Sequence, residues 1–217
     1  MMFYGIYERC QSQRATLENH PPLLEARQWP ATYRGGVVFL EAQHWRLSVG
    51  GEVEAPFAMG LNELLGHFAK SHQFRRLVSA EGWTYRSQWE GIPLKQLVQQ
   101  VRPRPTAKYL RQVNSLGQEE TVRLASVLER DPLLVLRENG QPLSPLHGGP
   151  VRLLFFDRYD YKSLHHVTQL LFTETPGRSD YTLPGYPEDG QIESNRYYAF
   201  DLKAFRPIER PGEVTGY

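Results

Sequence analysis

The stretch from Asn139 to Val167 constrains the fold more than any other part of this chain. It opens with an Asn-Gly turn, continues into a Gly-Gly-Pro loop that follows His147, and then passes through a short apolar strand into an aromatic loop. Asn-Gly and Gly-Gly-Pro sequences both mark turns in the backbone. The stretch therefore predicts two loops that are held together by one buried strand.

Two cations border these loops. Arg152 follows the Gly-Gly-Pro sequence, and Lys162 lies in the aromatic loop beside Ser163. Glycine-rich loops bring backbone N–H groups close to a phosphate, and nearby cations add to the attraction. This pattern predicts an anion-binding site. The alternative is that Gly-Gly-Pro is only a turn and that Arg152 is a solvated residue at the end of a strand.

Three segments of the chain match one known pattern in the same order. The first reads NGxPLxxxHGGPxR followed by YxxKS, over residues 139–163. The second is SAEGW at residues 79–83 followed by WEGIPL at residues 89–94, and the third is LSVGGEVEAPFAMGLNELL at residues 47–65. Together they resemble the sulfite oxidase family of molybdopterin oxidoreductases over residues 45 to 175. The resemblance implies an α+β fold, a single domain of mixed, mostly β sheets with short helices.

The resemblance also implies a binding site for molybdopterin, the organic part of the molybdenum cofactor. By this comparison Asn139, His147 and Arg152 hold the pterin and its terminal phosphate, Arg152 through charge-assisted hydrogen bonds. Lys162 and Ser163 match a cation and a hydroxyl that the family places near the pterin. A chain that binds no cofactor is the alternative.

The residue at the family's metal-ligand position is Ser79. Working members of the family have a cysteine there, whose thiolate bonds molybdenum beside the two dithiolene sulfurs of the pterin. A serine hydroxyl is less acidic than a thiol and gives a harder oxygen ligand. Ser79 is therefore either an altered metal ligand with a catalytic role or a residue that caps a buried loop. We prefer the second interpretation. Tyr159 and Tyr186 are the candidates for orienting a substrate.

Three further positions depart from the family pattern. Asp160 stands where glycine is usual and adds a carboxylate to a loop that should approach an anion, which costs free energy unless a cation intervenes. His165 stands where a second cation, usually lysine, is expected, and we expect it to be mostly neutral at pH 7. Asp157 replaces a proline or a small residue. With Ser79, all three point toward weakened metal chemistry.

Composition and sequence limit the partners and the cellular compartment that we expect for this protein. The 217 residues carry a formal net charge of +1, which gives no overall field to attract nucleic acid. No apolar run approaches the roughly 20 residues of a membrane span. The N-terminal residues show no export signal, so we expect a cytoplasmic protein. A single cysteine, Cys10, excludes any disulfide within the chain, and we expect it to be an unreactive thiol.

Three regions follow from the pattern along the chain. Residues 1–44 are expected to form an irregular N-terminal arm, residues 45–175 the molybdopterin-binding type of domain, and residues 176–217 an extension that wraps the domain or docks a partner. Tyrosine and arginine, which anchor many interfaces, are frequent in this extension. A partner protein is therefore expected at the arm or at the extension, and an active enzyme would need a separate electron-transfer protein.

Periodicity predicts the local elements of the domain. Helices are expected at residues 59–68 and 94–101, with a helical turn at 125–130. Strands are expected at 45–53, 74–78, 109–113, 120–124, 132–136 and 170–172, of which 109–113 and 120–124 form a hairpin. Trp83, Trp89 and the turn Gly91-Ile92-Pro93-Leu94 are interpreted as core packing.

Two functional hypotheses of different classes remain. The first is a protein with this fold whose molybdenum redox catalysis is weakened or lost and which serves as a binding or assembly module. Ser79, Asp160 and His165 favour it. The alternative is a working oxidoreductase in which Ser79 ligates the metal and an oxygen atom is exchanged with a small oxo-acid or sulfoxide. The intact NGxPLxxxHGGPxR pattern favours at least a retained pocket.

Overall fold

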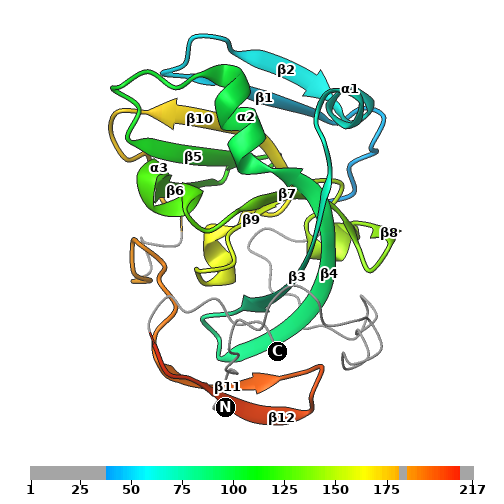
Figure 1. Ribbon diagram of the computed structural model, residues 1–217, viewed down its shortest axis with the longest axis vertical. Coiled ribbons are helices and arrows are strands. Elements are labelled where there is room, and N and C mark those ends of the chain that lie inside the picture. Colours follow the sequence, from blue (N-terminus) through cyan, green and yellow to red (C-terminus); the bar gives the residue numbers. More distant parts are fainter. Residues whose placement is uncertain (1–37, 181–184, 211–217) are drawn as a thin grey trace.

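The protein is described by a computed structural model that places residues 38–180 and 185–210 (Figure 1). Two β-sheets make up most of it, and three short α-helices lie at the ends of their strands. The predicted α+β class, with mixed and mostly β structure, is confirmed. The N-terminal arm with Cys10 lies outside the described residues, apart from its last few positions.

The first sheet has five strands in the order β2-β1-β10-β5-β6. Strand β1 runs parallel to β10, and the other neighbours are antiparallel. Alternate residues of β1, Leu47 and Val49, are fully covered, as expected of a strand with one face on the core. The strands are β1 (Arg46–Gly51), β2 (Phe57–Gly60), β5 (Tyr109–Asn114), β6 (Glu119–Arg123) and β10 (Val167–Thr173).

Helices close the main core against this sheet. Helix α2 (Leu94–Val101) turns Leu94, Leu97 and Val101 inward at helical spacing. Helix α1 (Leu61–His67) adds Leu64, and α3 (Leu124–Leu128) follows β6 directly. The helices predicted at residues 59–68 and 94–101 are confirmed.

The second sheet carries the residues that the family resemblance singles out. Its strands follow the order β12-β11-β4-β7-β8, with β3 paired to β4 and β9 paired to β7. Figure 1 shows β4 as a long bent strand that runs from the first sheet and α2 down to β11. The strands are β3 (Ser71–Val78), β4 (Trp83–Pro93), β7 (Leu133–Glu138), β8 (Gln141–Pro142), β9 (Arg152–Leu154), β11 (Asn195–Ala199) and β12 (Ala204–Ile208).

Strands β4, β11 and β12 differ from the prediction. Strand β4 was expected as a turn with core packing, but it is an 11-residue strand. Nearly all of its residues are covered on both faces, so the alternation of apolar and polar residues that reveals a strand is missing. Strands β11 and β12 form a hairpin in a region for which no strand was predicted. No described helix is long and apolar enough to cross a membrane.

The described part of the extension packs on the domain. Tyr198 and Ala199 of β11 pair in parallel with Trp83 and Thr84 of β4. The Arg76 guanidinium donates two hydrogen bonds, of 2.7 and 2.6 Å, to the carboxylate of Asp201 in the β11–β12 turn. Both side chains of this ion pair are buried. The extension therefore lies against the loop that follows β3, where Ser79 is found.

Candidate functional site

Ser79 lies directly after β3, in the tight loop that leads into β4. Its N–H donates to the carbonyl of Trp83, and Gly82 N–H donates back to the Ser79 carbonyl at 3.0 Å. Gly82 has φ +90, a conformation that glycine adopts without strain. The Ser79 side chain is 1% exposed, and its Oγ accepts a hydrogen bond from Glu81 N–H. The loop thus holds one hydroxyl inside the protein.

Asp160 is the carboxyl group that faces this hydroxyl. The Ser79 hydroxyl lies close enough to the Asp160 carboxyl to influence its pKa. Burial raises the pKa of Asp160 to about 6, although the Arg152 guanidinium and the Ser79 hydroxyl both favour the ionised form. The nearby Glu81 carboxylate raises this pKa further. At pH 7 the site therefore contains an ionised carboxylate that can accept a proton.

Arg152, at the start of β9, is the cation next to this pair. Its Nε donates to the carbonyl of Ser163 at 2.8 Å, and its Nη2 donates to the carbonyl of Asp160 at 3.2 Å. The side chain is 4% exposed. Two backbone carbonyls of the aromatic loop therefore fix the guanidinium, and its charge is balanced by Asp160 across the site.

His147 lies at the end of the 3-10 helix η3 (Pro145–His147), before the Gly-Gly-Pro loop. Its Nδ1 is 2.9 Å from an oxygen of the Glu138 carboxyl, and both side chains are buried. Burial raises the pKa of Glu138, and the contact with His147 opposes this change. Gly148 has φ +92, and a Cβ there would lie 2.8 Å from the Cα of His165. The loop is therefore packed directly against the residues that follow the aromatic loop.

Two histidines close this side of the site. His165 has a pKa well below its usual value because of burial and the nearby Arg152, so it is neutral at pH 7 as the sequence suggested. His166 is 1% exposed and donates from Nδ1 to the Gly149 carbonyl, 2.6 Å away. In the part of the chain that the structure describes, its Nε2 has no hydrogen-bond partner.

Asn139 and Ser163 serve the backbone around the site. Asn139, with φ +48 in the β7–β8 turn, accepts hydrogen bonds from the Ser87 hydroxyl and from Gln88 N–H, both at 3.0 Å. The Ser163 hydroxyl accepts a hydrogen bond from Phe155 N–H at 3.0 Å. A direct role for these two residues in holding a pterin stays a prediction.

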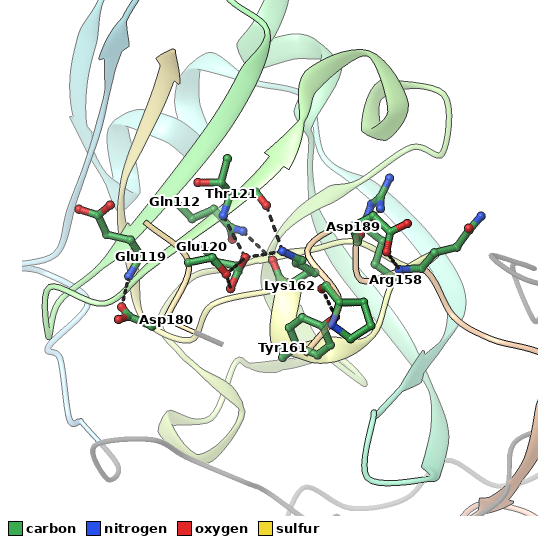
Figure 2. Close-up of polar contacts among 12 residues, drawn as sticks. Gln112, Glu119, Glu120, Thr121, Arg158, Tyr161, Lys162, Asp180 and Asp189 are labelled. Carbon is green, nitrogen blue, oxygen red and sulfur yellow. Dashed lines mark hydrogen bonds and ion pairs between the residues drawn. The ribbon is translucent and has the colours of Figure 1, made fainter. Parts of the chain in front are cut away.

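Lys162 lies in the 3-10 helix η4 (Asp160–Lys162), and its charge is already paired. Its Nζ donates to Glu120 Oε1 at 2.5 Å and to the Thr121 carbonyl at 3.2 Å (Figure 2). Neither Lys162 nor Glu120 is exposed at all. Glu120 lies 42 residues away from Lys162 on β6, and no motif in the sequence points to the pair.

Tyr159 and Tyr186, the candidates for orienting a substrate, lie in an aromatic cluster that includes residues of the extension. The Tyr159 hydroxyl is 2.6 Å from the Tyr197 hydroxyl of β11. The Tyr186 ring packs on Tyr161, with 5.0 Å between the ring centroids. Tyr161 in turn donates its hydroxyl proton to the Pro187 carbonyl. Substrate orientation by Tyr159 or Tyr186 stays a prediction.

The structure therefore brings some predicted residues together and not others. Ser79, Asp160 and Arg152 form one contiguous group, although Ser79 and Asp160 are far apart in the sequence. Lys162 is turned toward Glu120. Among residues 38–180 and 185–210, no three His, Cys, Asp or Glu side chains come together in a way that could hold a metal ion without a cofactor.

Comparison with known proteins decides the family. The family model described as the oxidoreductase molybdopterin binding domain matches residues 34–181. The chain belongs to this family. The matched range contains the loop of Ser79, the Gly-Gly-Pro loop and the aromatic loop.

Similar proteins match part of this chain. The catalytic subunit of protein-methionine-sulfoxide reductase from Xanthomonas axonopodis pv. citri is 29% identical over 151 residues, which are 62% of this chain and 47% of the relative. The same subunit from Campylobacter jejuni is 23% identical over 154 residues, 63% of this chain and 52% of the relative. This chain spans about half the length of these relatives.

A solved structure shares the fold. The crystal structure of the sulfane dehydrogenase SoxCD from Paracoccus pantotrophus superposes with a TM-score of 0.64 and 18% identity. The match covers 82% of this chain and 48% of that chain. The mostly β fold of the family is thereby confirmed for this chain.

The residues present fit a pterin cofactor in two respects. Arg152 is fixed by backbone carbonyls next to Ser79 and Asp160. His166 Nε2 is a buried acceptor with no partner in the described residues, which a donor of a bound ligand would satisfy. A role for Ser79 as the protein ligand of the metal stays a prediction.

Proposed function

We propose that this protein is a molybdopterin-dependent oxidoreductase that transfers an oxygen atom to or from a small sulfur compound, with a sulfoxide as the favoured substrate. The observation that carries the proposal is the Ser79–Asp160 pair, in which a buried hydroxyl at the position expected for the metal ligand lies next to a half-buried carboxyl and to Arg152. Relatives named protein-methionine-sulfoxide reductase catalytic subunits support the sulfoxide class. They favour the working enzyme over the binding module that the sequence alone suggested.

Ser79 is proposed as the protein ligand of the metal. A neutral hydroxyl is a weak ligand, and binding through oxygen requires that its proton leave. The Asp160 carboxyl lies next to that hydroxyl, and its pKa of about 6 leaves it mostly ionised at pH 7. Asp160 is therefore placed to accept the proton from Ser79 Oγ. When bound, the molybdenum cofactor would supply the oxygen-atom exchange and the two electrons that reduction of a sulfoxide requires.

Other residues of the chain would bind and orient the cofactor. Arg152 presents a fixed cation to an anionic group, and charge-assisted hydrogen bonds of this kind are strong in a buried site. The loop of Gly148 allows the backbone to approach closely. His147 and Asn139 hold the turns on either side of this loop, since each is bonded to Glu138 or to the backbone of β4.

A binding module without metal is the second candidate, and one observation favours it. Asp160 places a carboxylate against the proposed ligand oxygen, where it would repel an anionic metal centre in a partly dry pocket. In that case the pterin pocket survives and the redox step does not. Under either candidate the partner is a protein, which for the enzyme is a separate electron-transfer protein. A cytoplasmic location stays a prediction.

The test compares Ser79→Ala and Ser79→Cys with the wild-type chain in a host that makes the molybdenum cofactor. Molybdenum and pterin per chain and reduction of a small sulfoxide by a chemical electron donor are the measurements. We expect Ser79→Ala to lose metal and activity but to keep the fold, and Ser79→Cys to keep metal. Ser48→Ala, an exposed serine on β1, is the matched control. Equal metal content in Ser79→Ala and in the wild type would reject Ser79 as the ligand.

A further inference from the structure

We infer that Glu120 is a positioning residue of the pterin site, because its buried ion pair with Lys162 holds the loop that fixes Arg152. The inference rests on the proposed function, since the site it serves is the proposed cofactor site. It also gives Lys162 a different role from the direct contact with the cofactor that the sequence predicts. The geometry that supports it joins three parts of the chain: the β5–β6 hairpin, the aromatic loop and the extension.

The ion pair itself is fully buried. Glu120 Oε1 accepts from Lys162 Nζ, and both Glu120 oxygens accept from the Ser179 hydroxyl at 2.7 Å. The Lys162 ammonium also donates to the Thr121 carbonyl (Figure 2). A pair with no exposed surface cannot touch a ligand that arrives from solvent. Removal of one member would leave the other as an uncompensated buried charge.

The pair fixes the backbone of the aromatic loop. The Lys162 carbonyl accepts from Gln112 Nε2 of β5 at 2.6 Å, so side chain and backbone of Lys162 are both attached to the same hairpin. The next carbonyl, that of Ser163, accepts from Arg152 Nε, and the Asp160 carbonyl accepts from Arg152 Nη2. The position of the guanidinium therefore depends on the turn that Lys162 anchors.

The extension closes the other side of the same loop. Ser179 reaches Glu120, and Asp180 exchanges hydrogen bonds with the backbone of Glu119 on β6. Further along, the Gly190 carbonyl accepts from Tyr159 N–H at 2.8 Å. A Cβ at Gly190 would collide with the aliphatic stem of Lys162. Figure 2 shows Lys162 between the hairpin on one side and the Arg158–Asp189 contact on the other.

The two roles of Lys162 predict opposite results for Glu120→Gln. If Lys162 binds the phosphate directly, loss of the Glu120 charge frees a cation and increases the pterin bound per chain. If the pair positions Arg152, the same substitution loosens the loop and decreases the pterin bound. Exchange of the Arg152 Nε–H with solvent, followed by NMR, reports on the Arg152–Ser163 hydrogen bond without any cofactor.

The experiment uses the full chain with three variants: Glu120→Gln, the milder Ser179→Ala, and Glu174→Gln as a control. Glu174 forms an exposed ion pair with Lys108. The indole N–H of Trp45, which donates to the Val167 carbonyl in the first sheet, gives the rate of global opening in the same spectrum. The quantity compared is the Arg152 exchange rate divided by the Trp45 exchange rate, which an overall loss of stability leaves unchanged.

We expect this ratio to rise about ten-fold in Ser179→Ala, because the variant loses a hydrogen bond to a charged group. The ratio should rise further in Glu120→Gln and stay constant in the control. Pterin per chain is expected to fall in the same order. An unchanged ratio in Ser179→Ala overturns the inference, whether or not Glu120→Gln folds, and so does more pterin in Glu120→Gln than in the wild type. If the wild-type chain binds no pterin but the ratio rises, the proposed function fails and the positioning role stands.

Discussion

Asp160 allows a quantitative test of the electrostatics of the site through the variant Asp160→Asn. Burial raises the pKa of this carboxyl from 3.8 to about 6. One pKa unit corresponds to about 1.4 kcal/mol, so keeping the group ionised costs the folded state up to about 3 kcal/mol. Asp160 is only half-buried, and solvent screening lowers this figure to about 1–3 kcal/mol. Asparagine removes the charge and keeps the size of the side chain.

The sign of the pH dependence follows from the raised pKa. Between pH 3.8 and about 6 the folded state binds more protons at Asp160 than the unfolded state does, so stability from this group is present at low pH and lost as pH rises. Urea unfolding should therefore show Asp160→Asn to be more stable than the wild type by about 1–3 kcal/mol near neutral pH, with a difference that vanishes in acid. Asp131→Asn, at an exposed ion pair with Lys95, is the control and should show no such trend.

If Asp160→Asn is less stable than the wild type across the whole pH range, the Asp160 carboxylate does not destabilise the folded state. That result would mean that the contact of the carboxylate with Arg152 outweighs its burial. The comparison uses the difference between two proteins, so contributions from other titrating groups cancel. The same variant also bears on function, because it removes the proposed proton acceptor of Ser79.

Three further predictions concern the frame around the site. Gly148→Ala should lower the free energy of unfolding by about 1–3 kcal/mol, as measured by chemical unfolding. Gly148 has φ +92, which is unfavourable for alanine, and the new Cβ would collide with the His165 backbone. Asp201→Asn removes the charge that pairs with the buried Arg76 guanidinium and should lower the free energy of unfolding by about 3–5 kcal/mol in the same assay. The pKa of His165 is lower in the folded state than in the unfolded state, so the unfolded state binds more protons and stability falls as pH drops below 6.5. His165→Gln should make this loss of stability smaller in a pH series of unfolding curves.

Each of these has a result that would contradict it. A Gly148→Ala protein as stable as the wild type would show that the loop can move away from His165. Equal stability of Asp201→Asn and the wild type would mean that water or another group replaces the lost partner of Arg76. A steeper loss of stability in acid for His165→Gln would show that this imidazole is protonated in the folded state.

Local patterns predicted the elements whose side chains alternate between core and solvent. Helix α1 and the β5–β6 hairpin were predicted because their apolar residues recur at helical or strand spacing. Strand β4 was missed because both of its faces are covered, which removes the alternation. Strands β11 and β12 owe their order to tertiary contacts, such as the Arg76–Asp201 ion pair, that no local pattern reveals.

The candidate site was predictable only in part for the same reason. The family pattern identified Ser79 and Arg152, and it identified Asp160 as a departure. It could not show that Asp160 and Ser79 are neighbours, since 81 residues separate them in the sequence. Lys162 looked like a free cation because its partner, Glu120, lies on another strand and belongs to no motif.

Molybdenum and pterin per chain test the central claim most directly. The measurement is elemental analysis, with pterin fluorescence after acid release, on the wild-type chain from a host that makes the cofactor. The proposed enzyme predicts near-stoichiometric amounts of both, and loss of the metal in Ser79→Ala. Pterin without metal would contradict the enzyme and support the binding module, and neither pterin nor metal would contradict the proposed cofactor site itself.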